Sequence, residues 1–198
     1  MKKLFPVILA TFIAAAGYGQ DFGIKGGLNY SNLVPDNSDL EYGEYIFGFH
    51  LGGFGAFELT EKLSLRPEVL YSKKGFDLEL PTASSAIKIQ RRFHYLSLPL
   101  LMEFKPLQRL SLLAGPEFGY LIAARQDVNL PAFSEDIDGM YRKFDFGLSV
   151  GINLQIIEKI QSEIRYTHGF SDLNNESGFA GSGLQNRTFQ LSVGYQIN

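Results

Sequence analysis

The chain has 198 residues, a formal net charge of −3, and neither cysteine nor tryptophan. This length suits one domain, and the near-neutral charge gives no reason to expect nucleic acid as a partner. A mean hydropathy of −0.03 does not argue against a strand-built membrane protein, because lipid-facing and lumen-facing residues would cancel.

The N-terminus has the pattern of a secretory signal. Lys2 and Lys3 precede an apolar run over residues 4–16, and Gly17 and Gly19 fit the small-residue positions of a cleavage site. The run is shorter than the ~20 residues of a membrane helix, and no cysteine follows it as in a lipoprotein. We expect a signal peptide over residues 1–19 and one domain over residues 20–198.

Eight later segments alternate apolar and polar residues with a period of two, which predicts β-strands. In residues 95–104, for example, one face is wholly apolar and the other carries Ser97 and Glu103. No segment shows sustained helical periodicity. The predicted strands cover residues 22–33, 45–59, 63–74, 95–104, 110–124, 142–155, 160–170 and 187–197.

The connections between these strands alternate strictly between long and short. The short ones fall near residues 60–62, 105–109 and 156–159, and the long ones include polar segments over 75–91 and 125–141. Up-and-down barrels of outer membranes sort their connections in this way, and strands of ~10 residues match a tilted crossing. A soluble lipocalin-like barrel is the alternative, but it would place its large apolar residues inward.

Aromatic residues gather near both ends of the apolar faces, as in the interfacial girdles of membrane barrels. The set toward the long connections is Tyr30, Phe47, Tyr71, Tyr120, Phe144, Tyr166 and Phe189, and the set toward the short turns is Phe22, Phe57, Phe104 and Tyr195. We therefore predict an all-β fold, an eight-stranded antiparallel up-and-down transmembrane β-barrel in outer-membrane lipid. Both mature termini should then be periplasmic, because the strand number is even.

Eight charged residues of the predicted strands fall on the faces opposite the apolar stripe. The acids are Glu68, Glu103, Glu117, Asp145 and Glu163, and the bases are Lys25, Arg66 and Arg165. Eight strands enclose a space only about wide enough for side chains, and buried charges must be paired. We therefore expect a polar lumen that is plugged by a charge network.

Other residue types give little sign of chemistry. The histidines are His50, His94 and His168, and Ser162 shares a strand face with His168 at roughly 20 Å, too far for a catalytic pair. His50 projects to the lumen side of its strand, with pairing across strands left open, and we read the three histidines as interfacial or rim residues. Two acidic connections lack the spacing of an EF-hand loop; their acids are Asp36, Asp39, Glu41 and Glu44, then Glu135, Asp136 and Asp138. We expect no catalytic residues, no metal and no cofactor.

Six segments resemble a known family, the outer-membrane β-barrels that include PorT and are abundant in Bacteroidota. They are PEVLYSKKGF (67–76), YLSLPLLMEF (95–104), LLAGPEFGYLI (112–122), FDFGLSVGINL (144–154), IRYTHGFSDLNN (164–175) and RTFQLSVGYQIN (187–198). The resemblance implies a small Gram-negative outer-membrane barrel with no assigned activity. PorT is tied to gliding and type IX secretion, a role that fold and motif alone do not transfer.

These observations leave three functions in view. The first is a monomeric structural or partner-binding barrel at the cell surface, with any protein partner held by the long connections. The second is a narrow solute channel, which the small interior disfavours. The third is a lipid-acting enzyme, for which no nucleophile and base stand close together in the sequence.

Overall fold

The computed structural model describes residues 21–35, 43–81, 86–129, 132–174 and 183–197, so the predicted signal peptide lies outside the described residues. Nearly all of the described chain is β-structure. The strands are β1 (Asp21–Pro35), β2 (Glu44–Thr60), β3 (Leu63–Pro81), β4 (Ala86–Leu107), β5 (Leu110–Asn129), β6 (Ala132–Asp136), β7 (Phe144–Ile157), β8 (Ile160–Gly169) and β9 (Leu184–Gln196). A short 3₁₀-helix, η1 (Asp138–Met140), precedes β7. Within these residues, no helix is both long and apolar enough to cross a membrane.

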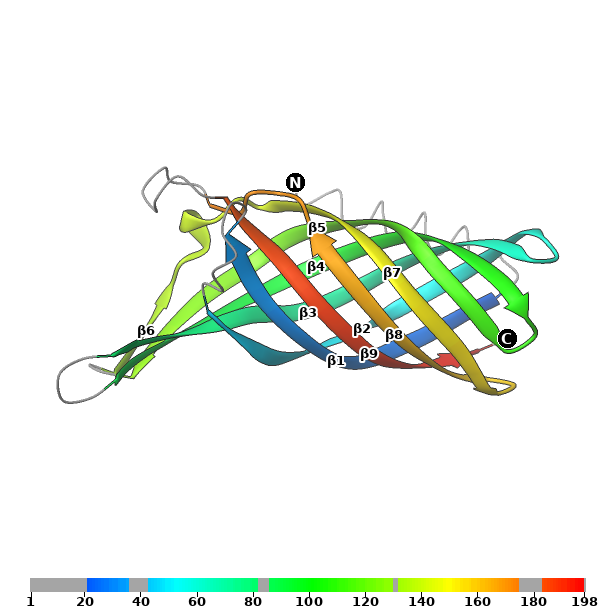
Figure 1. Cartoon of the computed structure of the whole chain (residues 1–198), viewed down its shortest axis with the longest axis horizontal. Helices are drawn as coiled ribbons and strands as arrows, with labels where there is room; N and C mark the ends of the chain where they lie inside the picture. Colours follow the sequence, from blue (N-terminus) through cyan, green and yellow to red (C-terminus); the bar gives the residue numbers. More distant parts are fainter. Residues whose placement is uncertain (1–20, 36–42, 82–85, 130–131, 175–182, 198) are drawn as a thin grey trace.

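Eight of the strands close into a tilted ring (Figure 1). Each strand pairs antiparallel with its neighbours in the order β1-β2-β3-β4-β5-β7-β8-β9, and β9 returns to β1 over 13 paired residues from Gly23↔Gln196 to Pro35↔Leu184. The small strand β6 stands outside the ring, paired only with β5. The predicted eight-stranded up-and-down barrel is therefore confirmed.

The strands β3, β4 and β5 extend well beyond the rest of the barrel, and this corrects two predicted connections. The sequence predicts a long loop over residues 75–91, but β3 and β4 stay paired up to Pro81↔Ala86. Residues 125–141 hold the end of β5, the hairpin strand β6 and η1. The alternation simply continues past the membrane: Leu78 pairs with Ile89 on one face, and Glu79 with Lys88 on the other.

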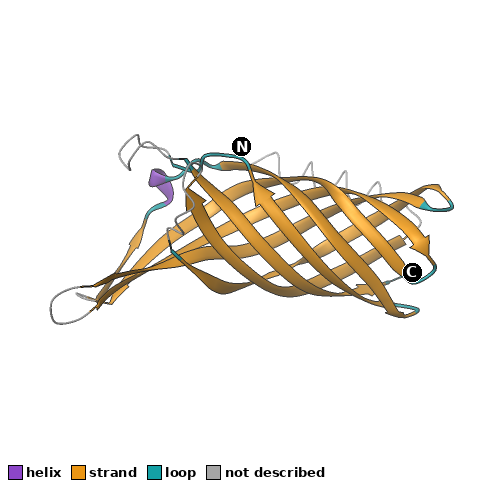
Figure 2. Ribbon diagram, in the orientation of Figure 1, coloured by secondary structure: helices purple, strands orange, loops and turns teal. Residues whose placement is uncertain are grey.

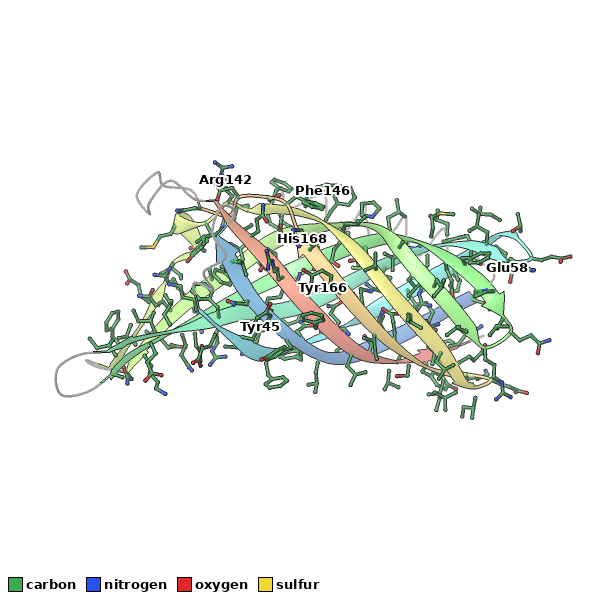
Figure 3. All side chains as sticks on the ribbon, in the orientation of Figure 1. Tyr45, Glu58, Arg142, Phe146, Tyr166 and His168 are labelled. Carbon is green, nitrogen blue, oxygen red and sulfur yellow. The ribbon has the colours of Figure 1, made fainter. Side chains whose placement is uncertain are left out.

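The two ends of the barrel differ in structure, one with short turns and the other with projecting strands (Figure 2). The short turns after β2, β4 and β7 and the start of β1 share one end, which we call the turn end; there the Ile197 amide donates to the Phe22 carbonyl at 2.7 Å. The projecting strands and η1 lie at the other, the loop end. Figure 3 shows the same polarity, with Glu58 at the turn end and Arg142 at the loop end.

The outer face of the ring is an exposed apolar band. Its side chains include Ile24, Leu28, Leu100, Ile152 and Val193, each more than 40 % exposed. Toward the loop end the band finishes in aromatic rings that touch across strands; these pairs are Tyr30–Phe47, Phe118–Phe146, Tyr120–Phe144 and Tyr166–Phe189, with ring centroids 4.8–5.4 Å apart. An apolar band with an aromatic girdle is the surface that lipid requires.

Glycine at inward positions allows neighbouring strands to bend closely past one another. A Cβ on Gly27 of β1 would lie 1.9 Å from the Leu191 carbonyl oxygen of β9, and one on Gly52 of β2 would lie 2.0 Å from that of Val69. No other residue fits at such positions without moving the backbone. These glycines therefore help set the curvature of the narrow ring.

Candidate functional site

The middle of the lumen holds a compact ion cluster drawn from four strands. Its three bases are Lys25 of β1, Arg66 of β3 and Arg165 of β8, and its three acids are Glu68 of β3, Glu103 of β4 and Glu163 of β8. All six side chains are buried. Three bases against three acids make the cluster neutral, which is how a closed interior can hold charge.

Arg165 and Lys25 both bridge the same two carboxylates. Arg165 Nη2 lies 2.8 Å from Glu68 Oε1 and 2.6 Å from Glu163 Oε1. Lys25 Nζ lies 2.8 Å from Glu163 Oε2 and 3.3 Å from Glu68 Oε1. Because the two acids come from β3 and β8, on opposite sides of the ring order, these pairs tie the barrel together across its lumen.

Arg66 is the cluster's outermost base on the turn-end side. Its guanidinium approaches Glu68 at 3.2 Å, Glu163 at 3.6 Å and Glu103 at 3.7 Å. It also sits over the ring of Phe54, 4.1 Å from the centroid. Phe54 breaks the polar pattern of its strand face, and a buried cation–π contact explains an aromatic residue at this inward position.

A second, smaller ion pair lies nearer the loop end. Lys74 Nζ of β3 approaches Glu117 Oε1 of β5 at 3.2 Å. The hydroxyls of Ser149 and Thr167 donate to Glu117 Oε2 at 2.9 and 3.1 Å. This pair too is neutral, and its carboxylate is fully hydrogen-bonded.

Asp145 differs from the other predicted lumen charges. The structure places it inside the barrel, where Asn186 Nδ2 donates to Asp145 Oδ2 at 2.6 Å. Among the described residues, none forms an ion pair with it, and its Oδ1 atom has no hydrogen-bond partner. The predicted set thus divides into a central cluster, the separate Glu117 pair, and an Asp145 held by an amide.

His50 is buried inside the lumen, which confirms its predicted lumen-side orientation, but its reading as an interfacial or rim residue is wrong. Its Nδ1 contacts Asn29 Oδ1 and its Nε2 contacts Ser192 Oγ, each at 2.8 Å. This is the chemical order of a Ser–His–Asn triad. Ser192 is only 2 % exposed, and Asn29 is also hydrogen-bonded to Ser72 and Gln190. The other two histidines do lie on the outer face, where His94 contacts Tyr71 and His168 contacts Tyr166.

An apolar core fills the loop end of the lumen. Its buried members are Leu33, Phe76, Phe93, Tyr95, Leu121, Ala124, Ile137, Tyr141 and Leu173. Residues after β6 and β8 complete it, since the Ile137 amide donates to the Ala124 carbonyl and the Arg142 amide to the Leu173 carbonyl, both at 2.9 Å. The lumen is therefore capped by hydrocarbon at this end.

The turn end, in contrast, is open and polar. A cavity of about 90 Å³ there is lined by side chains that include Lys105, Arg109, Gln155 and Lys159. Arg66 and Glu103 are among its most buried lining residues, and the lining does not include Lys25, Glu68 or Arg165. The cavity therefore borders only the turn-end layer of the ion cluster.

Beyond the loop end, the projecting parts of β3, β4, β5 and β6 form a small sheet with unlike faces; we call it the projecting sheet. One face has an apolar row, with Leu78, Ile89, Val128 and Phe133 in register across the four strands, and next to it a polar row of Arg91, Gln126 and Glu135. The other face carries paired charges, such as Lys88–Glu79 at 3.5 Å and Arg125–Asp136 at 3.3 Å. Phe133 is 47 % exposed, so part of the apolar row meets solvent.

The acidic connections give no metal centre in the part of the chain that is described. Asp36, Asp39 and Glu41 lie outside the described residues. Asp138 instead pairs with Lys143, and the hydrogen bond from that lysine lowers the pKa of the Asp138 carboxyl. No group of three or more His, Cys, Asp or Glu side chains in the described ranges could hold a metal ion.

A closed ring of tilted antiparallel strands, with an apolar outer band and a polar packed lumen, defines an outer-membrane β-barrel. Residues 19–175 match the family model "Outer membrane protein beta-barrel domain", and the chain belongs to this family. The protein is accordingly an outer-membrane protein. A search among curated proteins found no match.

Several solved structures share the fold at low sequence identity. Ail, the attachment invasion locus protein of Yersinia pestis, is 17 % identical with a TM-score of 0.52 over 90 % of this chain and 99 % of that chain. Neisserial surface protein A is 11 % identical, with a TM-score of 0.53 over 88 % of this chain and 96 % of that chain. A major outer membrane protein from Thermus thermophilus is 11 % identical, with a TM-score of 0.50 over 89 % of this chain and 98 % of that chain. These likenesses concern the fold alone.

Proposed function

We propose that this barrel is a closed membrane anchor that presents the projecting sheet to a binding partner at the cell surface. The observation that carries the proposal is the apolar core at the loop end, which caps a lumen already filled by neutral ion pairs. A barrel closed in this way offers no path for solutes, so its outward surfaces are what remains for function.

The projecting sheet supports a binding role because it is larger than barrel closure needs. An exposed Phe133 beside Ile89 and Val128 is an apolar patch of the kind that protein partners cover. A protein of similar fold, Ail, has been solved in complex with the heparin analogue sucrose octasulfate. That complex is in keeping with a binding function for small barrels.

We propose no catalytic role for the Ser192–His50–Asn29 arrangement. A nucleophilic serine needs room for a substrate carbonyl beside it, and the 2 % exposure of Ser192 leaves none. The hydrogen bonds instead satisfy buried polar groups from β1, β2 and β9. The solute channel and the lipid-acting enzyme are therefore both weaker proposals than the anchor.

Four finer assignments complete the proposal. We place the chain in the PorT-type group of the family on the six segments described above, without the PorT role in secretion. We also propose export through a signal peptide over residues 1–19, a monomeric state, and periplasmic placement of the turn end.

Single-cysteine labelling tests the orientation and the exposed sheet together, because the native chain has no cysteine. Ser134→Cys, in the exposed part of β6, should react with a membrane-impermeant maleimide on intact cells. Gln108→Cys, in the turn between β4 and β5, is the matched control and should react only after the outer membrane is permeabilised. The reverse pattern would overturn the proposed orientation.

The same two variants test the binding role. A benzophenone maleimide attached to Ser134→Cys should give a discrete photo-crosslinked adduct in growing cells, and Gln108→Cys should not give that adduct. The adduct should also weaken when Phe133 is changed to Ser in the Ser134→Cys background. If no adduct forms at Ser134, or if changing Phe133 to Ser leaves the adduct yield unaltered, the partner-binding role is wrong.

A further inference from the structure

The outer face carries a group of bases just above the apolar band on three adjacent strands. They are Lys73 of β3, Arg92 and His94 of β4, and Arg125 of β5. In register, Lys73 pairs with His94, and Arg92 pairs with Arg125. We call these four residues the basic rim.

The basic rim lies at the height of the lipid headgroups. Outward residues of β4 are apolar from Phe104 to Leu96, and His94 and Arg92 are the next two outward positions. On a strand tilted by ~40°, those positions stand roughly 5 and 10 Å above Leu96 along the membrane normal. His94 also contacts the hydroxyl of Tyr71, an aromatic residue of the girdle.

The arrangement of like charges is unfavourable by itself. Two arginines directly opposite each other on neighbouring strands repel, and a further base adds to that repulsion. Lys73 lies directly opposite His94, and Arg92 lies directly opposite Arg125, so the four groups act on one another. A bound anion would relieve the repulsion within such a group of bases.

The protein itself neutralises the rim only in part. Asp127 lies 3.9 Å from Arg92, and Asp136 lies 3.3 Å from Arg125, but these two acidic side chains are 47 % and 75 % exposed to solvent. Arg92 Nη2 also donates a hydrogen bond to Gln90 Oε1 at 2.7 Å. Each guanidinium has five N–H donors, so several remain for a ligand.

We propose that the basic rim binds the phosphate groups of phosphorylated outer-leaflet lipids. A lipid phosphate would sit between Arg92 and Arg125, which suit phosphate oxygens through paired N–H donors, and Lys73 would add a third positive charge. The acyl chains of the same lipid would lie against the apolar band below, beside Leu96 and Tyr71. The continuity of this band with the rim is why we assign a lipid as the occupant.

Native mass spectrometry of the full protein in detergent, with diphosphorylated lipid A or the same lipid stripped of phosphate, tests this proposal. The parent should bind phosphorylated lipid A at least tenfold more tightly than the stripped lipid. Arg92→Gln/Arg125→Gln should lose about thirtyfold in affinity, because each base near a charged headgroup contributes about fivefold. The matched control, Lys105→Gln/Arg109→Gln at the turn end, should bind as the parent does.

Heat-modifiable migration would show that each variant is folded. If the double variant fails to fold, Lys73→Gln alone should still lose about fivefold. Equal binding of the stripped lipid, or parent-like binding by the folded rim variants, would overturn the proposal. Inorganic phosphate that binds equally well by itself and displaces lipid A would overturn the lipid as the source of the phosphate.

Discussion

Arg165→Met should lower the free energy of unfolding by about 3–5 kcal/mol, the usual cost of leaving a buried charge without its partner. The change removes the short contacts to Glu68 and Glu163 and leaves three carboxylates facing two bases. Arg66→Ala should act in the same direction, with a smaller effect, because Arg66 borders the open cavity at the turn end. Urea unfolding of the barrel in liposomes measures both.

Two further variants make this test specific to charge. Lys88→Met removes an exposed pair with Glu79 and should change stability by less than ~1 kcal/mol. Arg165→Met/Glu163→Gln restores equal numbers of acids and bases and should recover much of the loss. If Arg165→Met unfolds at the parent's urea concentration, the cluster is hydrated and does not tie the barrel together.

Phe93→Ala should destabilise the loop end by about 3–5 kcal/mol, because the ring is fully buried and its loss leaves a cavity. Phe93 stacks near Phe76, at 6.1 Å between centroids, and meets Tyr141 edge-on at 4.8 Å. The effect should appear in urea unfolding and as faster proteolysis between β6 and β7, where Ile137 and Tyr141 would lose their support.

Phe133→Ala is the control for this change, since it removes the same ring from a half-exposed position in the projecting sheet. Its effect on the free energy of unfolding should stay within about 1 kcal/mol. Equal losses for Phe93→Ala and Phe133→Ala would mean that the apolar core contributes little to closing the loop end.

The ring itself can be predicted from the sequence because side-chain parity in a membrane barrel is strict. Residues 95–104 illustrate this: Leu96 to Phe104 face lipid at every second position, and Ser97 and Glu103 are buried. The projecting sheet differs from the prediction because the polar residues and Pro81 of its β3–β4 part also suit a loop. The alternation of Leu78 and Ile89 with Glu79 and Lys88 continues the strand pattern, and this is the available signal.

The sequence predicts that the lumen is polar and charged, but it does not predict which lumen side chains contact one another. Lys74 is absent from the predicted charge network, although it shares the inward parity of Arg66 and Ser72 and supplies a fourth base. The contacts of His50 with Asn29 and Ser192 depend on how far each strand is shifted against the next, and residue type alone does not fix that shift.

The apolar core can be predicted from strand parity only in part, because Leu33, Phe76 and Phe93 are inward residues of ring strands. Ile137, Tyr141 and Leu173 lie outside the ring strands and reach the core only because their connections fold back onto the barrel. Such contacts have no periodic signature in the sequence. They appear only when the whole chain is placed in space.

Single-channel recording of the purified mature protein in planar bilayers tests the central claim, that this barrel is closed and acts through its outward surfaces. The neutral ion cluster around Glu68 and Glu163 and the apolar core around Phe93 predict a flat baseline, with no lasting conductance at either polarity. Reproducible, long-lived open steps, together with passage of sugars into liposomes that contain the protein, would contradict the claim.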